Sequence, residues 1–457
     1  MSKRPAIYLF VLTLLLTPLA AMAQDTHYWN NQYGPRAMLL SGSVIGSVED
    51  MSGTYYNPGA LGYIEEPELL LSANIYQATR LRVEDGAGEG FDLETSKFNL
   101  LPNMLAGAVK MTWLGKNKLA YSLLTRHRFD AEISGASVTR ADVLNDDGVE
   151  EDFAGGLLRS GDAKELWAGF TWARGGIGNK VGFGVTTYLS IRDQGVDSEF
   201  FAQALTDAGD MAVVYDIDNF SYDAYSLLWK AGVGVVLAPF TAGITLTTPN
   251  VQLFGSGQSV FNETRVGLPA AVAVDGFATS VQEDVSATYK SPLSIGVGGA
   301  WHSRKVKIHL SAEWFDGIDT YDVLELESFE SQATGEVIDP VVRQKLDSVF
   351  NVGAGIEYHV KEKTTAYLSF NTDNSVFNPE SDVSVTGYDL THLAAGVNTG
   401  FKRTQFMLGL GYTWGSQKTV QDIDLDPGDG GKVVGPGNEV NVVYRRLSLM
   451  LGFSVNI

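Results

Sequence analysis

The chain ends in the stretch V-Y-R-R-L-S-L-M-L-G-F-S-V-N-I, residues 443–457. From Leu447 to Ile457 every second residue is apolar, and most of the residues between them are small or polar. Successive side chains of a β-strand point to opposite faces, so this stretch has one apolar and one polar face. A tilted strand crosses a bilayer in about 9–11 residues, and the stretch is long enough to do so. The sequence therefore predicts a membrane-spanning β-strand here.

The same alternation recurs along the chain and gives fourteen candidate strands joined by alternately long and short connections. The short connections lie near 114–116, 176–179, 238–239, 303–304, 361–362 and 402–403. The long connections lie near 82–94, 132–162, 193–218, 255–281, 317–345, 376–386 and 416–439. This rhythm is typical of bacterial outer-membrane barrels, whose turns are short on the periplasmic rim and long outside. The predicted fold is all-β, a 14-stranded antiparallel transmembrane β-barrel. One of its strands is expected to run through 285–302 without a break.

Composition and motifs narrow the function. The formal net charge is −21 and no basic stripe offsets it, so nucleic acid is not an expected partner. The chain has no cysteine, which excludes disulfides and thiolate metal sites. It lacks the G-x-S-x-G elbow of hydrolases, the phosphate-binding glycine loops and the H-E-x-x-H zinc motif. We therefore expect no enzyme activity, no catalytic residues, no cofactor and no metal site.

The N-terminus has the features of an exported protein. Residues 1–23 combine Lys3 and Arg4, an apolar run and the sequence Ala21-Met22-Ala23, which predicts a cleaved signal peptide. The predicted barrel occupies 68–457. Residues 24–67 have no place in its wall, and a barrel of this size has a lumen that wall side chains alone do not fill. We expect this segment to be an N-terminal plug and the protein to be located in the bacterial outer membrane.

The expected plug carries a specific motif. It reads Gly34-Pro35-Arg36, then Asp50, then Y-Y-N-P-G-A-L-G over 55–62. This resembles the N-terminal region of the FadL-type outer-membrane transporters for long-chain fatty acids and other hydrophobic compounds. Asn57 and Pro58 match the family's Asn-Pro, whereas Gly59 stands where Ala is usual. A second likeness is A-G-I-T-L-T-T-P at 242–249, which is similar to a mid-barrel strand of the family.

The resemblance implies a mechanism and a gate. A hydrophobic ligand would be caught by the outer loops, pass to a pocket beside the plug and leave sideways through the wall without nucleotide. Asn57, Pro58 and Gly59 are the implied plug and gate residues. The implied partners are a long-chain fatty acid or hydrocarbon and the lipid of the outer membrane, and we expect a monomer.

Two loop segments are candidates for ligand capture. Residues 199–208 place apolar side chains at helical spacing, and residues 268–277 form a second apolar cluster. The candidate ligand-binding residues are Phe200, Phe201, Leu205, Leu268, Val272 and Phe277. Packing of these segments on each other, as a cap over the barrel, is the alternative. Lys290 and Arg192 are candidate partners for a ligand carboxylate, with pairing to lumen acids as the alternative.

Three functions remain open from sequence. The first is passive uptake of long-chain fatty acids or similar molecules. The second is transport of aromatic hydrocarbons by a protein of the same build. The third is a surface barrel that acts in adhesion or phage attachment and transports nothing.

Overall fold

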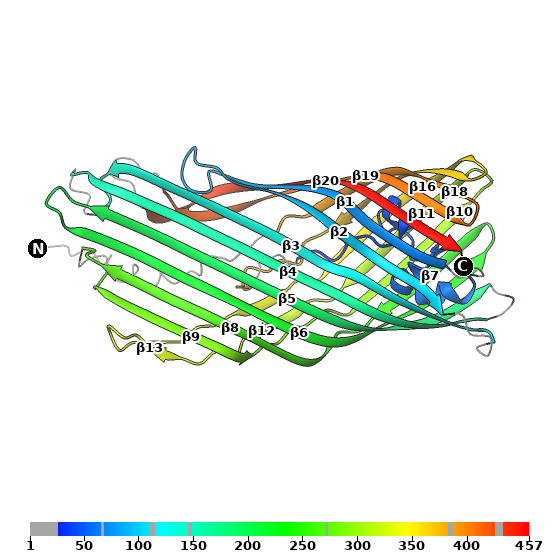
Figure 1. Cartoon of the computed structure of the whole chain (residues 1–457), viewed down its shortest axis with the longest axis horizontal. Coiled ribbons are helices and arrows are strands. Elements are labelled where there is room, and N and C mark those ends of the chain that lie inside the picture. Colours follow the sequence, from blue (N-terminus) through cyan, green and yellow to red (C-terminus); the bar gives the residue numbers. More distant parts are fainter. Residues whose placement is uncertain are drawn as a thin grey trace, which may run out of the picture.

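The computed structural model describes residues 26–64, 68–109, 115–144, 149–176, 178, 180–269, 273–382, 387–425 and 433–456. The signal peptide predicted at 1–23 lies outside these residues. Most of the described residues form one large antiparallel sheet that closes on itself (Figure 1). Among the described residues, no helix is both long and apolar enough to cross a membrane.

Fourteen strands build the wall, as predicted. In wall order they are β1 (Glu68–Glu84), β2 (Leu93–Val109), β3 (Asn117–Ala141), β4 (Glu151–Gly175), β5 (Val181–Leu205), β6 (Met211–Leu237), β7 (Phe240–Thr247), β10 (Ser294–His302), β11 (Val306–Phe315), β16 (Val349–Lys361), β17 (Thr364–Asp373), β18 (Leu390–Phe401), β19 (Thr404–Ile423) and β20 (Val434–Asn456). The first and last strands pair antiparallel from Glu68 with Asn456 to Glu84 with Asn441, which closes the barrel. Closure satisfies the backbone polar groups that an open sheet edge would leave exposed in lipid.

Six further strands lie on the side of the long loops. They are β8 (Val251–Val266), β9 (Gly276–Ser286), β12 (Ile318–Asp322), β13 (Phe329–Glu330), β14 (Val337–Ile338) and β15 (Arg343–Leu346). Strand β8 pairs with the outer part of β6, and β9 pairs with β8. These two strands therefore continue the wall upward above β7 and β10.

The wall has the side-chain pattern of a membrane barrel. On β19, Phe406, Leu408 and Leu410 are exposed on the outer face, while Met407 and Gly409 face the lumen. Similar exposed apolar side chains on β4, β5, β7, β10 and β16 form a continuous apolar belt. A closed sheet with such a belt is a bacterial outer-membrane β-barrel.

The outer parts of the strands differ from the sequence prediction. Strands β3 to β6 run far beyond the belt, so the connection predicted at 193–218 shrinks to residues 206–210 (Figure 1). The helix expected over 199–208 is wrong, because residues 181–205 form one strand, β5. Above the lipid, the outer face of the wall meets water and carries Asp193, Asp197 and Glu199. The apolar alternation that marks a lipid-facing strand is therefore absent there.

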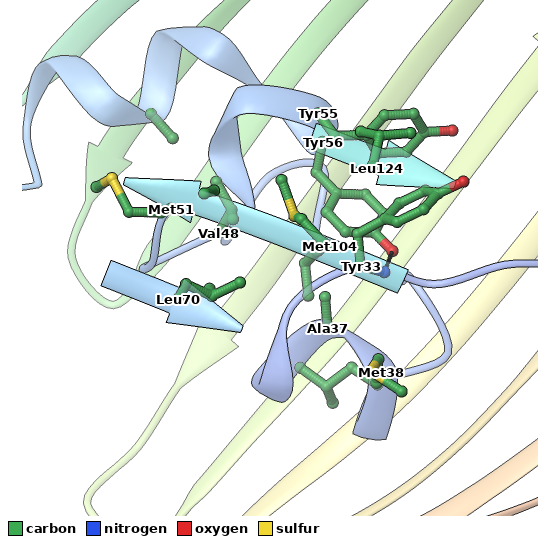
Figure 2. Packing of buried hydrophobic residues seen from close by; sticks show 14 of the residues in the cluster. Tyr33, Ala37, Met38, Val48, Met51, Tyr55, Tyr56, Leu70, Met104 and Leu124 are labelled. Carbon is green, nitrogen blue, oxygen red and sulfur yellow. Dashed lines mark hydrogen bonds between the residues drawn. The ribbon is translucent and has the colours of Figure 1, made fainter. Parts of the chain in front are cut away.

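The N-terminal segment, residues 26–64, lies inside the barrel (Figure 1). It contains the helices α1 (Pro35–Leu39) and α2 (Gly53–Tyr56) and the 3-10 helix η1 (Pro58–Gly62). Most of its apolar side chains form one buried cluster with side chains from the inner face of the wall, and Tyr28, Trp29 and Ile45 belong to a second cluster. Figure 2 shows Tyr33, Met38, Val48 and Met51 of the segment packed with Met104 of the wall. This cluster is the largest of four buried hydrophobic clusters among the described residues.

Candidate functional site

The predicted gate residues lie where the N-terminal segment meets the wall. The Asn57 side-chain amide donates to the carbonyl oxygen of Ile45 at 2.9 Å and to that of Val233, on β6, at 3.1 Å. Its side-chain oxygen accepts from the Gly59 backbone N–H at 3.0 Å, which caps η1. Asn57 is fully buried, so it joins two parts of the segment to the wall through a single side chain.

Gly59 is required by a close backbone approach. A Cβ atom at this position would stand 2.4 Å from the Gly232 carbonyl oxygen and 2.8 Å from that of Gly182. Contacts this short force a backbone to shift, so only glycine fits. Glycine replaces the alanine that is usual in the family at this position, and the packing here is nevertheless tight. The wall residues that Gly59 contacts are themselves glycines, so the two backbones come close together. Gly46 makes a similar approach to the backbone of Gly298.

An ionic cluster also ties the segment to β11 and β16. The Arg36 Nε atom lies 2.5 Å from a Glu357 carboxylate oxygen, and Arg36 also donates to the Ser47 carbonyl oxygen at 2.7 Å. Lys307 donates to both oxygens of Glu49, at 2.9 and 3.1 Å. The Glu49 side chain is about half exposed, and partial desolvation tends to raise the pKa of its carboxyl, but Arg36 and Lys307 outweigh this effect and hold the pKa below the ordinary value of 4.5.

A central cavity lies directly above the segment. Its lining combines aromatic rings with a few charged groups: Tyr28, Tyr55, Trp167, Tyr289 and Phe315, with Arg126, Lys230, Glu165 and Glu313. Its free volume of about 30 Å³ holds only about two water molecules. Any organic ligand must therefore displace side chains or part of the segment to enter it.

Arg126 is the charged group in this cavity that is best placed to meet a ligand. Its guanidinium lies 5.7 Å from the ring centre of Tyr28 and 5.4 Å from that of Trp167. It donates to the Tyr28 carbonyl oxygen at 2.7 Å. Within the described ranges no carboxylate oxygen lies within 4.0 Å of it, whereas Lys230 pairs with Glu313 at 3.4 Å. A partly buried guanidinium without a carboxylate partner within 4.0 Å can bind an anionic group.

The two cations predicted to meet a ligand have other environments. Arg192 is fully buried, donates to Tyr222 and Gln194, and lies 3.5 Å from Glu165. Its guanidinium also stacks over the Tyr289 ring at 4.4 Å. Lys290 is exposed, and its ammonium lies 4.6 Å from the Tyr321 ring centre. Arg192 thus belongs to a polar network beside the cavity. Strand alternation predicts Arg126 as one of several lumen-facing cations that could meet a carboxylate, but it does not single Arg126 out, because stacking on Tyr28 and Trp167 depends on long-range contacts.

The predicted loop residues do not gather in one groove. Phe200 faces the lumen and is buried against Phe153 and Leu157. Phe201, Leu205 and Phe277 stand on the outer face of the wall, where Leu205 and Phe277 are exposed. Leu268 is half-buried near the end of β8, and Val272 lies outside the described residues.

The wall itself has a seam between β2 and β3. These strands pair only from Met104 with Leu124 to Val109 with Leu119. Over the described residues 93–103 of β2 and 125–141 of β3, no ladder joins them, although β2 remains paired with β1 and β3 with β4. Side chains bridge the seam instead. Lys97 lies 3.3 Å from Asp130 and 3.5 Å from Glu132, and Thr125 donates to the Pro102 carbonyl oxygen at 2.8 Å.

The N-terminal segment covers the seam from inside. Tyr33 donates through its hydroxyl to the carbonyl oxygens of Thr125 and Arg126, at 3.2 and 3.3 Å. The Asn31 amide donates to the Thr125 carbonyl oxygen at 3.3 Å. These carbonyls lie on the unpaired part of β3, so the segment replaces the missing strand partner. Arg126 is thus the residue where seam, segment and cavity meet.

Comparison with solved structures gives the same architecture. The toluene transporter TodX of P. putida superposes with a TM-score of 0.61 and 12% identity, covering 93% of this chain and 99% of that one. A FadL homologue from Pseudomonas aeruginosa gives 0.57 and 11%, covering 96% and 99%. The toluene transporter TbuX of Ralstonia pickettii gives 0.54 and 12%, covering 93% and 99%. No protein-family model matches the sequence, and no curated protein does.

Fold and site together define a class. The chain is an outer-membrane β-barrel with an internal N-terminal segment and a side-chain-bridged seam in its wall. Its architecture is that of the FadL-type channels, to which the Asn57-Pro58 motif already pointed.

Proposed function

We propose that this barrel carries long-chain fatty acids, or similar hydrophobic molecules with an anionic head, passively across the outer membrane. Residues 24–67 act as the plug, Asn57, Pro58 and Gly59 hold it against the wall, and the seam between β2 and β3 is the lateral exit. The arrangement around Arg126 supports this most directly. Its guanidinium lies in the cavity, and its backbone carbonyl lies at the seam under the Tyr33 hydroxyl.

The physical sequence of events follows from these contacts. A carboxylate that reaches Arg126 gains charge-assisted hydrogen bonds. The ligand's tail needs room, because the cavity as it stands holds only water-sized molecules. Displacing Tyr28 to Tyr33 provides that room and removes the groups that cover the seam. The apolar tail of the ligand then faces lipid through the seam. Transfer of this tail from water into lipid is favourable and drives the ligand out of the barrel without nucleotide.

Aromatic hydrocarbon transport is the second candidate. The five aromatic rings of the cavity lining favour it, and so do the names of two structural relatives, both called toluene transporters. A neutral hydrocarbon would not need Arg126. The charge of the ligand therefore separates the two candidates.

The test is uptake of labelled oleate and labelled toluene by cells with and without the protein. A variant with Asn103→Cys and Thr125→Cys, which stand opposite each other at the lower end of the seam, locks the exit when oxidised. Oleate uptake that depends on the protein and stops on oxidation supports the proposal. Oleate uptake equal with and without the protein contradicts it, and toluene uptake in that case favours the second candidate.

A further inference from the structure

The wall has a second interruption, on the side away from the seam. The ladder between β7 and β10 ends at Thr247 with Ser294, and the ladder between β8 and β9 ends at Ser256 with Ser286. The last backbone bond above the gap runs from the Ala287 N–H to the Gly255 carbonyl oxygen. Between them, residues 248–254 and 288–293 face each other with no backbone-to-backbone hydrogen bond in this described stretch. We call this gap the window.

Two side-chain amides close the window. Gln252 accepts from the Tyr289 N–H at 2.7 Å and donates to the Ala287 carbonyl oxygen at 2.5 Å. Asn250 accepts from the Ser291 N–H at 2.7 Å and donates to the Tyr289 carbonyl oxygen at 2.8 Å. Each amide therefore makes the two bonds that a strand residue would make through its backbone. Unlike a backbone ladder, an amide side chain opens by rotating about its own χ angles, without moving the strand.

The window lies at the level of lipid. Below it, Ile244, Leu246 and Ile295 are exposed on the outer face, and within it Leu253 and Phe254 are 51% and 60% exposed. The gap starts eight residues after Phe240, the first residue of β7. Since about 9–11 residues cross the bilayer, this is the outward-facing end of the hydrocarbon layer.

The central cavity lies directly behind the window. Tyr289, Ser291 and Pro292 from one edge line that cavity, together with Thr247 from the other. The two amides bridge the gap between this lining and the lipid-facing surface; Asn250 also donates to the Ser226 hydroxyl at 2.9 Å, and the Tyr321 hydroxyl accepts from the Lys290 N–H at 3.3 Å. Pro249 and Pro292 lie within the gap, where proline's missing N–H costs no ladder bond.

We propose that the window is a side entrance, through which hydrophobic molecules already dissolved in the outer leaflet reach the central cavity when the Asn250 and Gln252 amides swing aside. The inference rests on the proposed uptake function but concerns a different opening from the seam. It adds a second source of ligand, the membrane itself, for molecules with long alkyl or aromatic bodies.

The first test needs no transport. Because the chain has no cysteine, Ser291→Cys carries the only thiol. The protein is placed in vesicles of phosphatidylethanolamine and phosphatidylglycerol, and labelling by the lipid-soluble reagent pyrene maleimide is timed. Asn250→Ala with Gln252→Ala should speed labelling about tenfold, the factor that corresponds to losing about 1.4 kcal/mol of closing energy. Asn262→Ala, on the continuous part of β8, should leave the rate unchanged.

A matched position tests labelling where the wall has a continuous backbone ladder. Thr171→Cys faces the lumen where the β4–β5 ladder is continuous, and it should stay unlabelled. Equal labelling of Ser291→Cys with and without the two amides would overturn the proposal. Assembly of the double alanine variant is judged by heat-modifiable gel mobility. If it fails to assemble, Gln252→Ala alone gives the same comparison, with a smaller expected increase in labelling rate.

The second test separates the window from the proposed function. Asn250→Cys with Ser291→Cys locks the window on oxidation, and Asn103→Cys with Thr125→Cys locks the seam. Oleate supplied in the outer membrane should enter several-fold more slowly with a locked window, and reduction should restore the rate. Normal uptake with the window locked overturns the side entrance while the proposed function stands. If the unmodified protein takes up no oleate, the proposed function fails, and the labelling rates still decide whether the window opens.

Discussion

The Asn57 side-chain amide lies 3.1 Å from the Val233 carbonyl oxygen, so one buried hydrogen bond ties the N-terminal segment to β6. Asn57→Ala leaves this carbonyl and that of Ile45 without their donor, at a cost of about 1–3 kcal/mol. We expect the barrel to assemble normally and the segment to be cleaved faster by added protease. Asn262→Ala, an asparagine far from the segment, is the control. Unchanged protease resistance of the segment in Asn57→Ala would show that Asn57 does not hold it.

Gly59→Ala should also weaken the contact between the N-terminal segment and β6, in this case by a steric clash. Its Cβ would stand 2.4 Å from the Gly232 carbonyl oxygen, and such overpacking typically costs about 1–3 kcal/mol. We expect faster proteolysis of the segment and altered oleate uptake. Gly90→Ala tests a glycine of the outer loops that has open space around it, although its positive φ adds some strain. A Gly59→Ala segment as resistant as the original would contradict the packing described above.

Arg126→Met should separate the two transport candidates. It keeps much of the apolar stem that packs on Tyr28 and Trp167 but removes the charge that would meet a carboxylate. We expect oleate uptake to fall about tenfold, the equivalent of one charge-assisted hydrogen bond of about 1.4 kcal/mol, and toluene uptake to stay the same. Lys290→Met, at an exposed cation outside the cavity, should change neither. Equal loss of both ligands would mean that Arg126 acts on the shape of the cavity and recognises no carboxylate.

Lys97→Met should weaken the seam. It removes the ion pairs to Asp130 and Glu132 that bridge β2 and β3. We expect a modest rise in oleate uptake, up to a few-fold, because exposed pairs are worth about 0–1 kcal/mol. Arg80→Met is a close match, since Arg80 pairs with Glu94 across the continuous β1–β2 ladder. A rise of equal size in both variants would assign the effect to surface charge and exclude the seam as its cause.

Because of the ionic cluster around Glu49, the binding of the N-terminal segment to the wall should depend on pH. The pKa of Glu49 in the docked segment lies below its ordinary 4.5, so docking favours the charged form. This contribution is fully present above pH 4.5 and is lost as the pH falls through the lowered pKa. We expect the difference in protease resistance between the original protein and Glu49→Gln to be constant from neutral pH down to about pH 5 and to decline below about pH 4. Glu49→Gln should lower the resistance at neutral pH.

The lipid-facing wall was predictable, and the parts above and inside it were less so. Lipid imposes an apolar side chain at every second position, as on β20, and this pattern revealed the strands and their number. Above the lipid, both faces of β5 meet polar surroundings or packed loops, so residues 199–205 gave a misleading helical spacing. The strand expected through 285–302 is broken at 287–293, and the signal available for the break was Pro292 with Pro249 opposite.

The candidate site was predictable only where a local motif marks it. Asn57 and Pro58 were recognisable because their spacing is short and specific. The role of Arg126 depends on contacts with Tyr28, about a hundred residues away in sequence. The seam depends on which backbone groups of β2 and β3 lack partners. Neither the role of Arg126 nor the seam has a local sequence pattern. Both depend on where residues that are distant in sequence lie once the barrel has closed.

The paired glycines at the surface between segment and wall constrain how this protein can change over time. Gly59 meets Gly182 and Gly232, and Gly46 meets Gly298, with backbone against backbone. A side chain gained on either partner cannot be accommodated by a smaller residue on the other, since both are already the smallest possible. The loops can therefore diversify toward new ligands, while these positions must be inherited unchanged as a set.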